Sequence, residues 1–590
     1  MFAKCPTTIN LEVVSGRECN SSPSLALKAD GKYYLFNTPP LTYTKLKSID
    51  ISEANIKQVF FTNITPAATS GLIEVTDFKK NYPDEFELSL TGPAGIDKIQ
   101  FYRNGITVTK FVWDITDSYS NEFMKVSSIH MSKSYSYDIS ILKKGKPNRE
   151  IFEEHNESFN NYIWNLSKGE EVKLKDGFII KPSDIFQLEE IHILIVDCFE
   201  LSDLDSIKVE LTKYNCIIHF TKQELYTDEY LKFFECNSCN YYFGDSHILN
   251  LSTSKRYEKY LTDDLILPLT IENTNVNLGK GFLTIKKGEV YNFVYNHFAV
   301  EPMSKPIVIL KENIHELPDF NSFAITVLGT VAGSLTKEYF TSGYLLHTKD
   351  GFIAIDTGEG FLERITQKYG RKNVKIILSN MKAIYISHRH YDHINGLLEL
   401  LIARSLLTNN KAFICADNVV LDEIHMKEEF LYYKGYFNLI YKDRTEPVTI
   451  EGGTVIKSCH VMHCENSMGC LFELSNGYKV AYSGDRNSSD NSFIDFIGKD
   501  IDLLIHESTY YNTDSDKAMN WNHSTFEKAL ETGEKANAKY ILLCHFSQRY
   551  NRKIFSPLPE NCICGFEYLS FSFDKCKEIC EACKNNSDES

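Results

Sequence analysis

The chain has 590 residues, which is enough for two or more domains with complete hydrophobic cores. Hydrophobic residues make up 43% and charged residues 24%, and both shares are ordinary for a folded globular protein. The net charge of −16 excludes a uniformly basic nucleic-acid coat, although it leaves room for a local basic groove. No apolar run reaches the length that spans a bilayer, and the sixteen cysteines fall below the density of a disulfide scaffold.

Short strand-like runs separated by turn residues fill the first part of the chain. We expect strands at Ile9–Val14, Tyr33–Phe36, Gln58–Thr62 and Phe86–Leu90. A basic segment rich in helix breakers follows at residues 143–149, and residues 170–300 return to alternating strands and short helices. The periodicity fades over residues 301–320, around three prolines. This predicts a first domain over 1–300, a linker over 301–320 and a second domain over 321–590.

The two halves share an internal repeat. When Val59 is aligned with Ile384, an apolar strand, a polar loop, a glycine (Gly71 or Gly396) and an apolar helix start follow in the same order. Upstream, the run 34–38 similarly matches the run 353–357. A repeat of this length predicts a duplicated domain rather than a solenoid. The metal-binding residue types occur only in the second copy, where Asn63 of the first copy is replaced by His388.

The most informative motif is Ser387-His-Arg-His-Tyr-Asp-His-Ile-Asn-Gly396, which lies between two apolar runs. The spacing predicts a strand, a tight loop and a helix. Three imidazoles and one carboxylate within six residues can bind one or two transition-metal ions, because imidazole suits zinc and carboxylates can bridge. Such ions lower the pKa of water and supply a nucleophile for hydrolysis at neutral pH.

Further donors follow later strands of the second half. His463 comes after a strand-like run, Asp485 ends a strand in Gly-Asp, Glu507 ends another, and His545 ends a fourth. Each of these alone is typical of a turn or a satisfied surface residue. Their joint order after the histidine loop predicts one metal centre at the edge of a sheet.

These motifs resemble the metallo-β-lactamase superfamily and, within it, the long form of tRNase Z, an endoribonuclease that removes 3′ trailers from precursor tRNA. The more specific matches are His506-Glu507-Ser-Thr, Asn522-His523-Ser-Thr and His545-Phe-Ser-Gln-Arg-Tyr550. The resemblance implies an α/β fold of two tandem metallo-β-lactamase-like αβ/βα sandwich domains, the first without metal ligands. It also implies a metal-dependent hydrolysis that leaves a tRNA 3′-hydroxyl.

Roles carried over from the family fall on individual residues. The first of two zinc ions would be bound by His388, His390 and His463, and the second by Asp392, His393 and His545, with Asp485 bridging them. Asp392 would also orient or deprotonate the attacking water, and Glu507 with His523 would protonate the leaving 3′ oxygen. Substrate contacts are expected from Arg486, Arg549 and Arg552 near the site, and from Lys143 and Lys144 in a tRNA-binding arm near residues 142–167.

Two positions depart from the family pattern. Arg486 stands where a threonine is usual, and the Gly-Thr-Gly-Ser-Ala loop is only partly kept at Gly329–Lys337. Two alternatives therefore stay open: another hydrolase of the superfamily, or a catalytically reduced tRNA-binding scaffold. We further expect a monomer with two pseudo-symmetric halves, no membrane association, and a location in the nucleus and/or the cytoplasm, because the first residues show no evident mitochondrial targeting.

Overall fold

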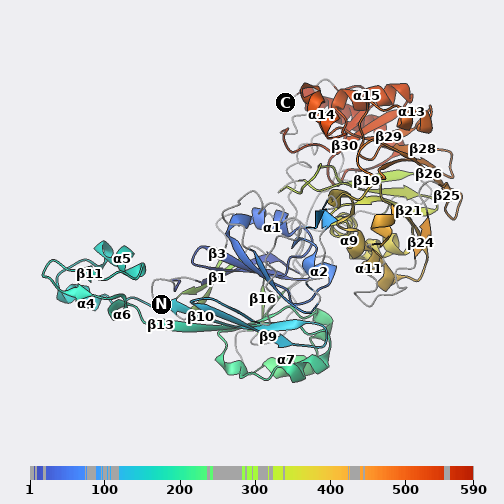
Figure 1. Ribbon diagram of the computed structural model, residues 1–590. Helices are drawn as coiled ribbons and strands as arrows, with labels where there is room; N and C mark the ends of the chain where they lie inside the picture. The colour runs from blue at the N-terminus through green and yellow to red at the C-terminus, as the bar shows by residue number, and fades with distance from the viewer. Residues whose placement is uncertain are drawn as a thin grey trace. The chain divides into compact units, whose positions relative to one another are not determined.

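The computed structural model describes residues 5–588 except 7–8, 17–21, 73–74, 76–87, 95, 97–101, 104–105, 108–117, 236–239, 244–281, 286–288, 295–296, 303–316, 318–322, 337–338, 423, 425–438, 443–445 and 551–557. The chain divides into two compact units (Figure 1). Unit 1 comprises Met1–Phe101, Val108–His247 and Glu272–Ile309, and unit 2 comprises Tyr102–Thr107, Ile248–Ile271 and Leu310–Ser590. The predicted domain bounds stay a prediction, and strand β18 reaches Pro302, inside the segment expected to be a linker.

Unit 2 contains two seven-stranded mixed sheets. The first has the order β24-β23-β22-β21-β20-β19-β32 and the second β25-β26-β27-β28-β29-β30-β31. The strands of the first sheet are β19 Ala324–Gly329, β20 Gly343–Thr348, β21 Gly351–Thr357, β22 Met381–Tyr385, β23 Ala412–Cys415, β24 Leu439–Lys442 and β32 Ser570–Ser572. Those of the second are β25 Val448–Thr449, β26 Val455–His460, β27 Met468–Glu473, β28 Lys479–Tyr482, β29 Leu503–Glu507, β30 Tyr540–Cys544 and β31 Cys562–Cys564.

Helices cover the outer faces of these sheets. The helices are α9 Phe361–Ser379, α10 Tyr391–Ile394, α11 Leu397–Leu407, α13 Ser492–Ile497, α14 Ser515–Asn520, α15 Phe526–Lys535 and α16 Cys576–Asp588. Apolar residues of α9 and α11 pack against the first sheet, whereas residues of both sheets, α13, α15 and α16 share a second core (Figure 1). The central strands are buried on both faces and therefore read as continuous apolar runs. The result is the expected αβ/βα sandwich.

Unit 1 repeats this arrangement. Its sheets have the orders β18-β17-β1-β2-β3-β4-β5 and β16-β15-β14-β13-β10-β9-β8. The strands of these sheets are β1 Ile9–Ser15, β2 Ser24–Ala29, β3 Lys32–Phe36, β4 Ile56–Phe60, β5 Ser89–Thr91, β8 Ser118–Ser120, β9 Met124–His130, β10 Tyr135–Lys144, β13 Leu188–Val196, β14 Cys216–His219, β15 Asn240–Phe243, β16 Phe282–Ile285, β17 Glu289–Val294 and β18 His297–Pro302. Its helices include α1 Thr42–Ser48, α2 Pro66–Thr69 and α7 Asp228–Phe234.

The predicted repeat is matched in register. Phe36 pairs with Phe60 in parallel β3 and β4, as Ile355 pairs with Tyr385 in β21 and β22. The helix after the loop is α2 in unit 1 and α10 in unit 2, at equivalent positions of the repeat. The shared glycine has a steric cause: a Cβ at Gly396 would lie 2.5 Å from a backbone oxygen, and one at the equivalent glycine of unit 1 would lie 2.3 Å from another.

An insertion projects from unit 1 between β10 and β13. It comprises residues 145–187, and its elements are α4 Glu150–Glu154, α5 Ile163–Ser167, α6 Pro182–Ile185, β11 Val172–Lys173 and β12 Ile179–Ile180. Phe152, Phe159, Leu166 and Ile180 belong to a small core of its own. Figure 1 shows this module at the end of the β10–β13 ribbon, away from the sheets of unit 1. Among the helices of the described residues, none is both long and apolar enough to cross a membrane.

Candidate metal centre

The histidine loop begins where a buried strand ends. β22 terminates at Tyr385, and Ser387 and His388 follow it into the loop that enters α10. His390 is the N-cap residue of α10, and Asp392 and His393 lie in its single turn. A strand tip followed by one helical turn brings all four donors to the same edge of the sheet, as the motif spacing predicted.

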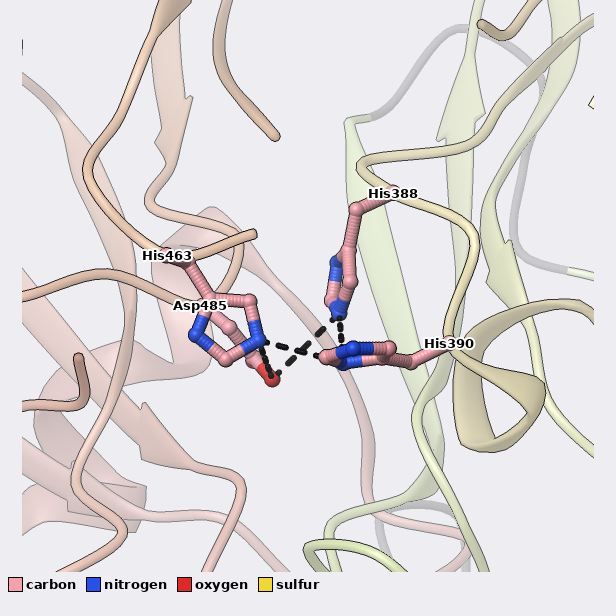
Figure 2. A group of neighbouring side chains, drawn as sticks. All are labelled: His388, His390, His463 and Asp485. Atoms are coloured by element: carbon pink, nitrogen blue, oxygen red, sulfur yellow. Dashed lines mark hydrogen bonds and ion pairs between the residues drawn. The ribbon is translucent and has the colours of Figure 1, made fainter. Parts of the chain in front are cut away.

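The first donor group contains His388, His390, His463 and Asp485, whose ligand atoms lie within 4.8 Å of one another (Figure 2). His390 Nδ1 is 3.0 Å from His388 Nε2 and 3.1 Å from His463 Nε2. Asp485 Oδ2 is 3.6 Å from His388 Nε2 and 3.7 Å from His463 Nε2. Burial lowers the pKa of all three imidazoles, that of His390 to about 4, so they are neutral and can offer lone pairs.

The second donor group contains Asp392, His393 and His545. His545 Nε2 lies 3.5 Å from Asp392 Oδ2 and 3.3 Å from His393 Nε2. Asp485 Oδ2 is also 3.4 Å from His393 Nε2 and 3.2 Å from His545 Nε2. One carboxylate oxygen therefore faces both groups, which is the position that a bridging ligand occupies.

The donor set fits transition-metal ions. Asp485 Oδ1 is buried and has no hydrogen-bond partner, and such an atom is costly unless a cation or water satisfies it. The imidazoles of the first group are neutral, and neutral imidazoles beside carboxylates are ligands that zinc takes. Burial opposes the charge of Asp392 and of Asp485, but the surrounding histidines outweigh it and keep the pKa of both carboxyls below the ordinary value.

Asp356 supports this centre and was not named as a site residue from the sequence. It is the penultimate residue of β21, the upstream strand of the repeat. Its carboxylate accepts from the Ser387 backbone N–H at 2.7 Å, the Tyr482 hydroxyl at 2.6 Å and His393 Nδ1 at 2.7 Å. The last contact fixes the His393 ring with Nε2 free for a metal. The available signal was the Asp-Thr that ends the strand in the upstream part of the repeat.

The equivalent place in unit 1 is filled by a hydrogen-bonded network. Asn37, at the position of Asp356, accepts from the Thr62 backbone N–H at 2.8 Å. Asn63, at the position of His388, donates to Asp197 Oδ2 at 3.0 Å, and Thr65 donates to Asn63 at 2.6 Å. Amide and hydroxyl groups thus satisfy the buried carboxylate without an ion.

His523 and Glu507 form a pair beside the donor groups. His523 Nδ1 lies 3.0 Å from Glu507 Oε1, which also accepts from the Arg486 backbone N–H at 2.8 Å. Burial opposes a charged imidazole here, but the Glu507 carboxylate outweighs it and raises the pKa of His523 to about 9. His523 also lies close to Asp485 and His545, and these three residues form a third group that could hold a metal ion. The contact with Glu507 favours a charged imidazole instead.

Thr509 links this pair to the second donor group. Its hydroxyl contacts Glu507 Oε2 and lies 2.9 Å from His545 Nδ1. Because the carboxylate can only accept, the hydroxyl donates to it and accepts from the His545 ring, which leaves His545 Nε2 for a metal. Helix α15 begins just after His523, with Thr525 as its N-cap residue accepting from the Lys528 backbone N–H.

The incomplete glycine loop still reaches the metal centre. The Gly333 backbone N–H donates to Asp392 Oδ2 at 2.7 Å, and the Ser334 hydroxyl lies 2.6 Å from the Tyr391 hydroxyl. Val331 forms a bridge with Phe546, next to the ligand His545. The departure from the family pattern therefore leaves a backbone contact that needs no particular side chain.

The structure corrects three predicted substrate contacts. Arg486 is 1% exposed, and its guanidinium contacts His506, Thr532 and the Asp490 carbonyl, so its role is internal. Lys143 is buried against Glu189 at 2.7 Å, and Lys144 is buried and donates to the Ser167 carbonyl. The charged groups of these three side chains are occupied by partners within the fold.

The other two predicted contacts have different outcomes. Arg549 is exposed and donates to the Tyr510 hydroxyl at 3.2 Å, so it stays a candidate. Arg552 lies outside the described residues. The same applies to Lys553, which follows it.

Fold and site together define a protein of the metallo-β-lactamase fold with a complete metal-donor set, and the predicted fold class is confirmed. The structure is similar to the crystal structure of a long-form RNase Z from yeast, with a TM-score of 0.71 and 15% identity over 98% of this chain and 100% of that one. "Ribonuclease Z, mitochondrial" of Drosophila melanogaster is 24% identical over 92% of this chain and 84% of its own length. The resemblance to the long form of ribonuclease Z is therefore confirmed over nearly the whole chain.

Other similarities cover the second half. "Zinc phosphodiesterase ELAC protein 2" of Rattus norvegicus is 30% identical over 42% of this chain, which spans 33% of that relative. A family model described as Anti-Pycsar protein Apyc1 matches residues 323–557. This match covers less than half of the chain and includes no residue of unit 1.

The comparison corrects the predicted compartment. The fruit-fly relative is named mitochondrial, against the expectation of a nuclear and/or cytoplasmic protein without evident mitochondrial targeting. Import receptors recognise a short address, and that address leaves no mark on the packing of the folded units. Composition and the first strand therefore could not decide the compartment.

Proposed function

We propose that this chain removes the 3′ trailer from precursor tRNA and leaves a 3′-hydroxyl on the tRNA. The enzyme class, a metal-dependent endoribonuclease of the ribonuclease Z type, has the support of the named relatives. The observation that carries the finer proposal is the Glu507–His523 pair beside a shared-carboxylate metal centre. A phosphodiester with an alkoxide leaving group needs both features.

Two zinc ions fit the donor groups. His388, His390 and His463 would hold one ion, and Asp392, His393 and His545 the other, with Asp485 between them. When bound, the ions supply the Lewis acidity that activates water and offsets the phosphate charge. The zinc in the name of the rat relative supports this choice of metal.

Asp392 is placed to handle the water. Its Oδ2 is held by the Gly333 N–H, which fixes the orientation of the carboxylate. Its pKa below the ordinary value keeps it charged at neutral pH, so it can orient the water and accept its proton. The water oxygen forms the new bond to phosphorus.

His523 is placed to assist the leaving group. With a pKa of about 9 it carries a proton at neutral pH, and the buried Glu507 fixes its ring. As the bond between phosphorus and the 3′ oxygen breaks, its electron pair stays on that oxygen and His523 donates the proton. The products are a tRNA 3′-hydroxyl and a trailer with a 5′-phosphate.

The insertion over residues 145–187 would serve as the tRNA-binding arm. Its contacts would come from its own exposed residues and not from the buried Lys143 and Lys144. It exposes Trp164 and Phe178, and Lys168 Nζ lies 3.4 Å from the centre of the Trp164 ring. Exposed basic residues such as Arg149 and Lys173 alternate with acidic residues. We expect a contact made by rings and a few cations, with weaker salt dependence than a uniformly basic arm would give.

The deciding experiment uses the full chain with a 3′-extended precursor tRNA. Bound metal is counted, and Asp392→Ala and His523→Ala are assayed beside the wild type. Metal-dependent cleavage at the 3′ end of the tRNA, lost in Asp392→Ala, is the expected result. A metal-loaded protein that leaves the RNA intact but hydrolyses a thioester would point to another hydrolase of the fold, and tight tRNA binding without metal would point to a scaffold.

A further inference from the structure

Three exposed apolar side chains lie close in the chain to the metal-donor residue His463 and to the proton donor His523. Met462 is 50% exposed and precedes His463, while Met519 is 56% exposed and Trp521 67%, and both precede His523. The described residues contain nine large apolar side chains with such exposure, and three of them occur here. Scattered single residues of this kind are ordinary, so their concentration at one site is the informative feature.

One set of hydrogen bonds ties these residues to the site. The Asn487 backbone N–H donates to the Met462 carbonyl at 2.8 Å, and the Asn487 amide donates to the Met519 carbonyl at 3.5 Å. The Asn522 amide donates to the His463 carbonyl at 3.1 Å, and His463 Nδ1 donates to the Asn522 carbonyl at 3.0 Å. The segments that carry the three apolar side chains are therefore fixed against the metal ligand.

Core packing does not account for these side chains. Val461 and Ala518, their chain neighbours, are buried, whereas Met462, Met519 and Trp521 belong to no apolar cluster of the described residues. Asn522, between Trp521 and His523, adopts a positive φ of 53°, so the chain turns sharply between the exposed ring and the proton donor. The three side chains are available to a ligand.

We propose that Met462, Met519 and Trp521 form a stacking platform for the unpaired base of the nucleotide whose 3′ oxygen leaves. This inference rests on the proposed function, in which His523 donates its proton to that oxygen. The same nucleotide must then lie next to the segment that ends in His523. The platform has no charge of its own, so it suits the flat face of a base rather than a phosphate.

A stacking platform also fits the task of the enzyme. Every base has an aromatic face, so stacking on an indole flanked by thioethers tolerates any base at this position. The contact would orient the nucleotide without selecting its sequence. An enzyme that acts on many tRNAs needs a contact of this kind beside the bond that breaks.

The test compares two precursor tRNAs, one natural and one with an abasic ribose immediately 5′ of the cleavage site. For Trp521→Ala we expect a fall of about 5- to 150-fold in kcat/KM on the natural precursor and little further loss on the abasic one. Trp521→Phe should retain most of the wild-type value, because phenyl also stacks. Leu406→Ala, which truncates another exposed apolar residue, should behave as wild type.

Two results would overturn the platform. One is an equal loss of kcat/KM on both precursors, which would mean that Trp521 supports the shape of the active site and does not stack on the base. The other is no loss of kcat/KM on either precursor. A second readout separates this failure from failure of the proposed function. A precursor with 2-aminopurine at that nucleotide should lose fluorescence on binding to the wild type and keep it on binding to Trp521→Ala. If the wild type quenches the probe but never cuts, the proposed function fails, although a base still stacks on Trp521.

Discussion

The charge on His523 can be tested by replacing its partner with Glu507→Gln, which keeps the shape of the side chain and removes its charge. The ordinary histidine pKa of 6.5 rises to about 9 here, which corresponds to about 3 kcal/mol favouring the protonated ring. Burial lowers the pKa of the ring, whereas Asp485 and Asp392 raise it less than Glu507 does, so the variant ring should titrate well below the wild-type value and near the ordinary one. At pH 7.5 roughly a tenth of it or less would then carry a proton.

The sign of the pH dependence follows from this shift. A proton donor works in its protonated form, which persists below the folded-state pKa and disappears as the pH rises through it. In the wild type, His523 should stay protonated up to about pH 9, and the rate of trailer removal should decline only above that pH. In Glu507→Gln the decline should begin about two pH units or more lower. Single-turnover rates across this range, with equal metal content in both proteins, provide the measurement.

A modified substrate provides the matched control. If sulfur replaces the leaving 3′ oxygen, the thiolate leaves without a proton, and the variant should cleave this precursor about as fast as the wild type. An unchanged pH profile in Glu507→Gln, or an equal defect on the sulfur substrate, would refute the assignment of His523 as proton donor.

The remaining predictions concern positioning and binding. Gly333→Ala should lower kcat by about 10- to 100-fold, because the positive φ of 78° strains alanine and displaces the N–H that holds Asp392; an unaltered kcat would contradict this. Asp356→Asn should weaken metal binding by a similar factor, measured by chelator competition, because it removes the charged partner of His393, and unchanged affinity would argue against it. Replacing Lys146–Phe186 with Asn-Gly, which closes the β10–β13 hairpin, should raise KM for precursor tRNA without loss of bound metal; an unchanged KM would place the arm elsewhere.

The histidine loop shows how far local pattern could go. β22, the loop and α10 are formed by residues adjacent in sequence, so their spacing predicted both the elements and the facing of His388, His390 and His393. The repeat was also visible, because both copies keep the same strand, the same helix turn and the same sterically required glycine. A motif whose residues are neighbours in the chain can be predicted from the sequence alone.

The misassigned basic residues show where this reasoning stopped. Lys143 and Arg486 carry the charge that a phosphate contact needs, but Glu189 and the Asp490 carbonyl, brought in by other strands and turns, occupy their donors. Charge is a property of the residue, whereas availability depends on what the fold packs against it. Neither composition nor spacing reports that packing.

The sequence by itself determined the duplicated αβ/βα architecture and the family resemblance, because these depend on residue types at fixed spacing along the chain. Through that resemblance it also predicted the metal-donor residues. Only the tertiary structure gave the distances by which Asp485 faces both donor groups and Glu507 contacts His523, and only it revealed that Asp356 and Gly333 hold the ligands in place. It also decided that Met462 and Trp521, far apart in the chain, flank the same site. These contacts join segments that are distant in sequence, and their energies depend on distance and burial, which exist only once the chain has folded.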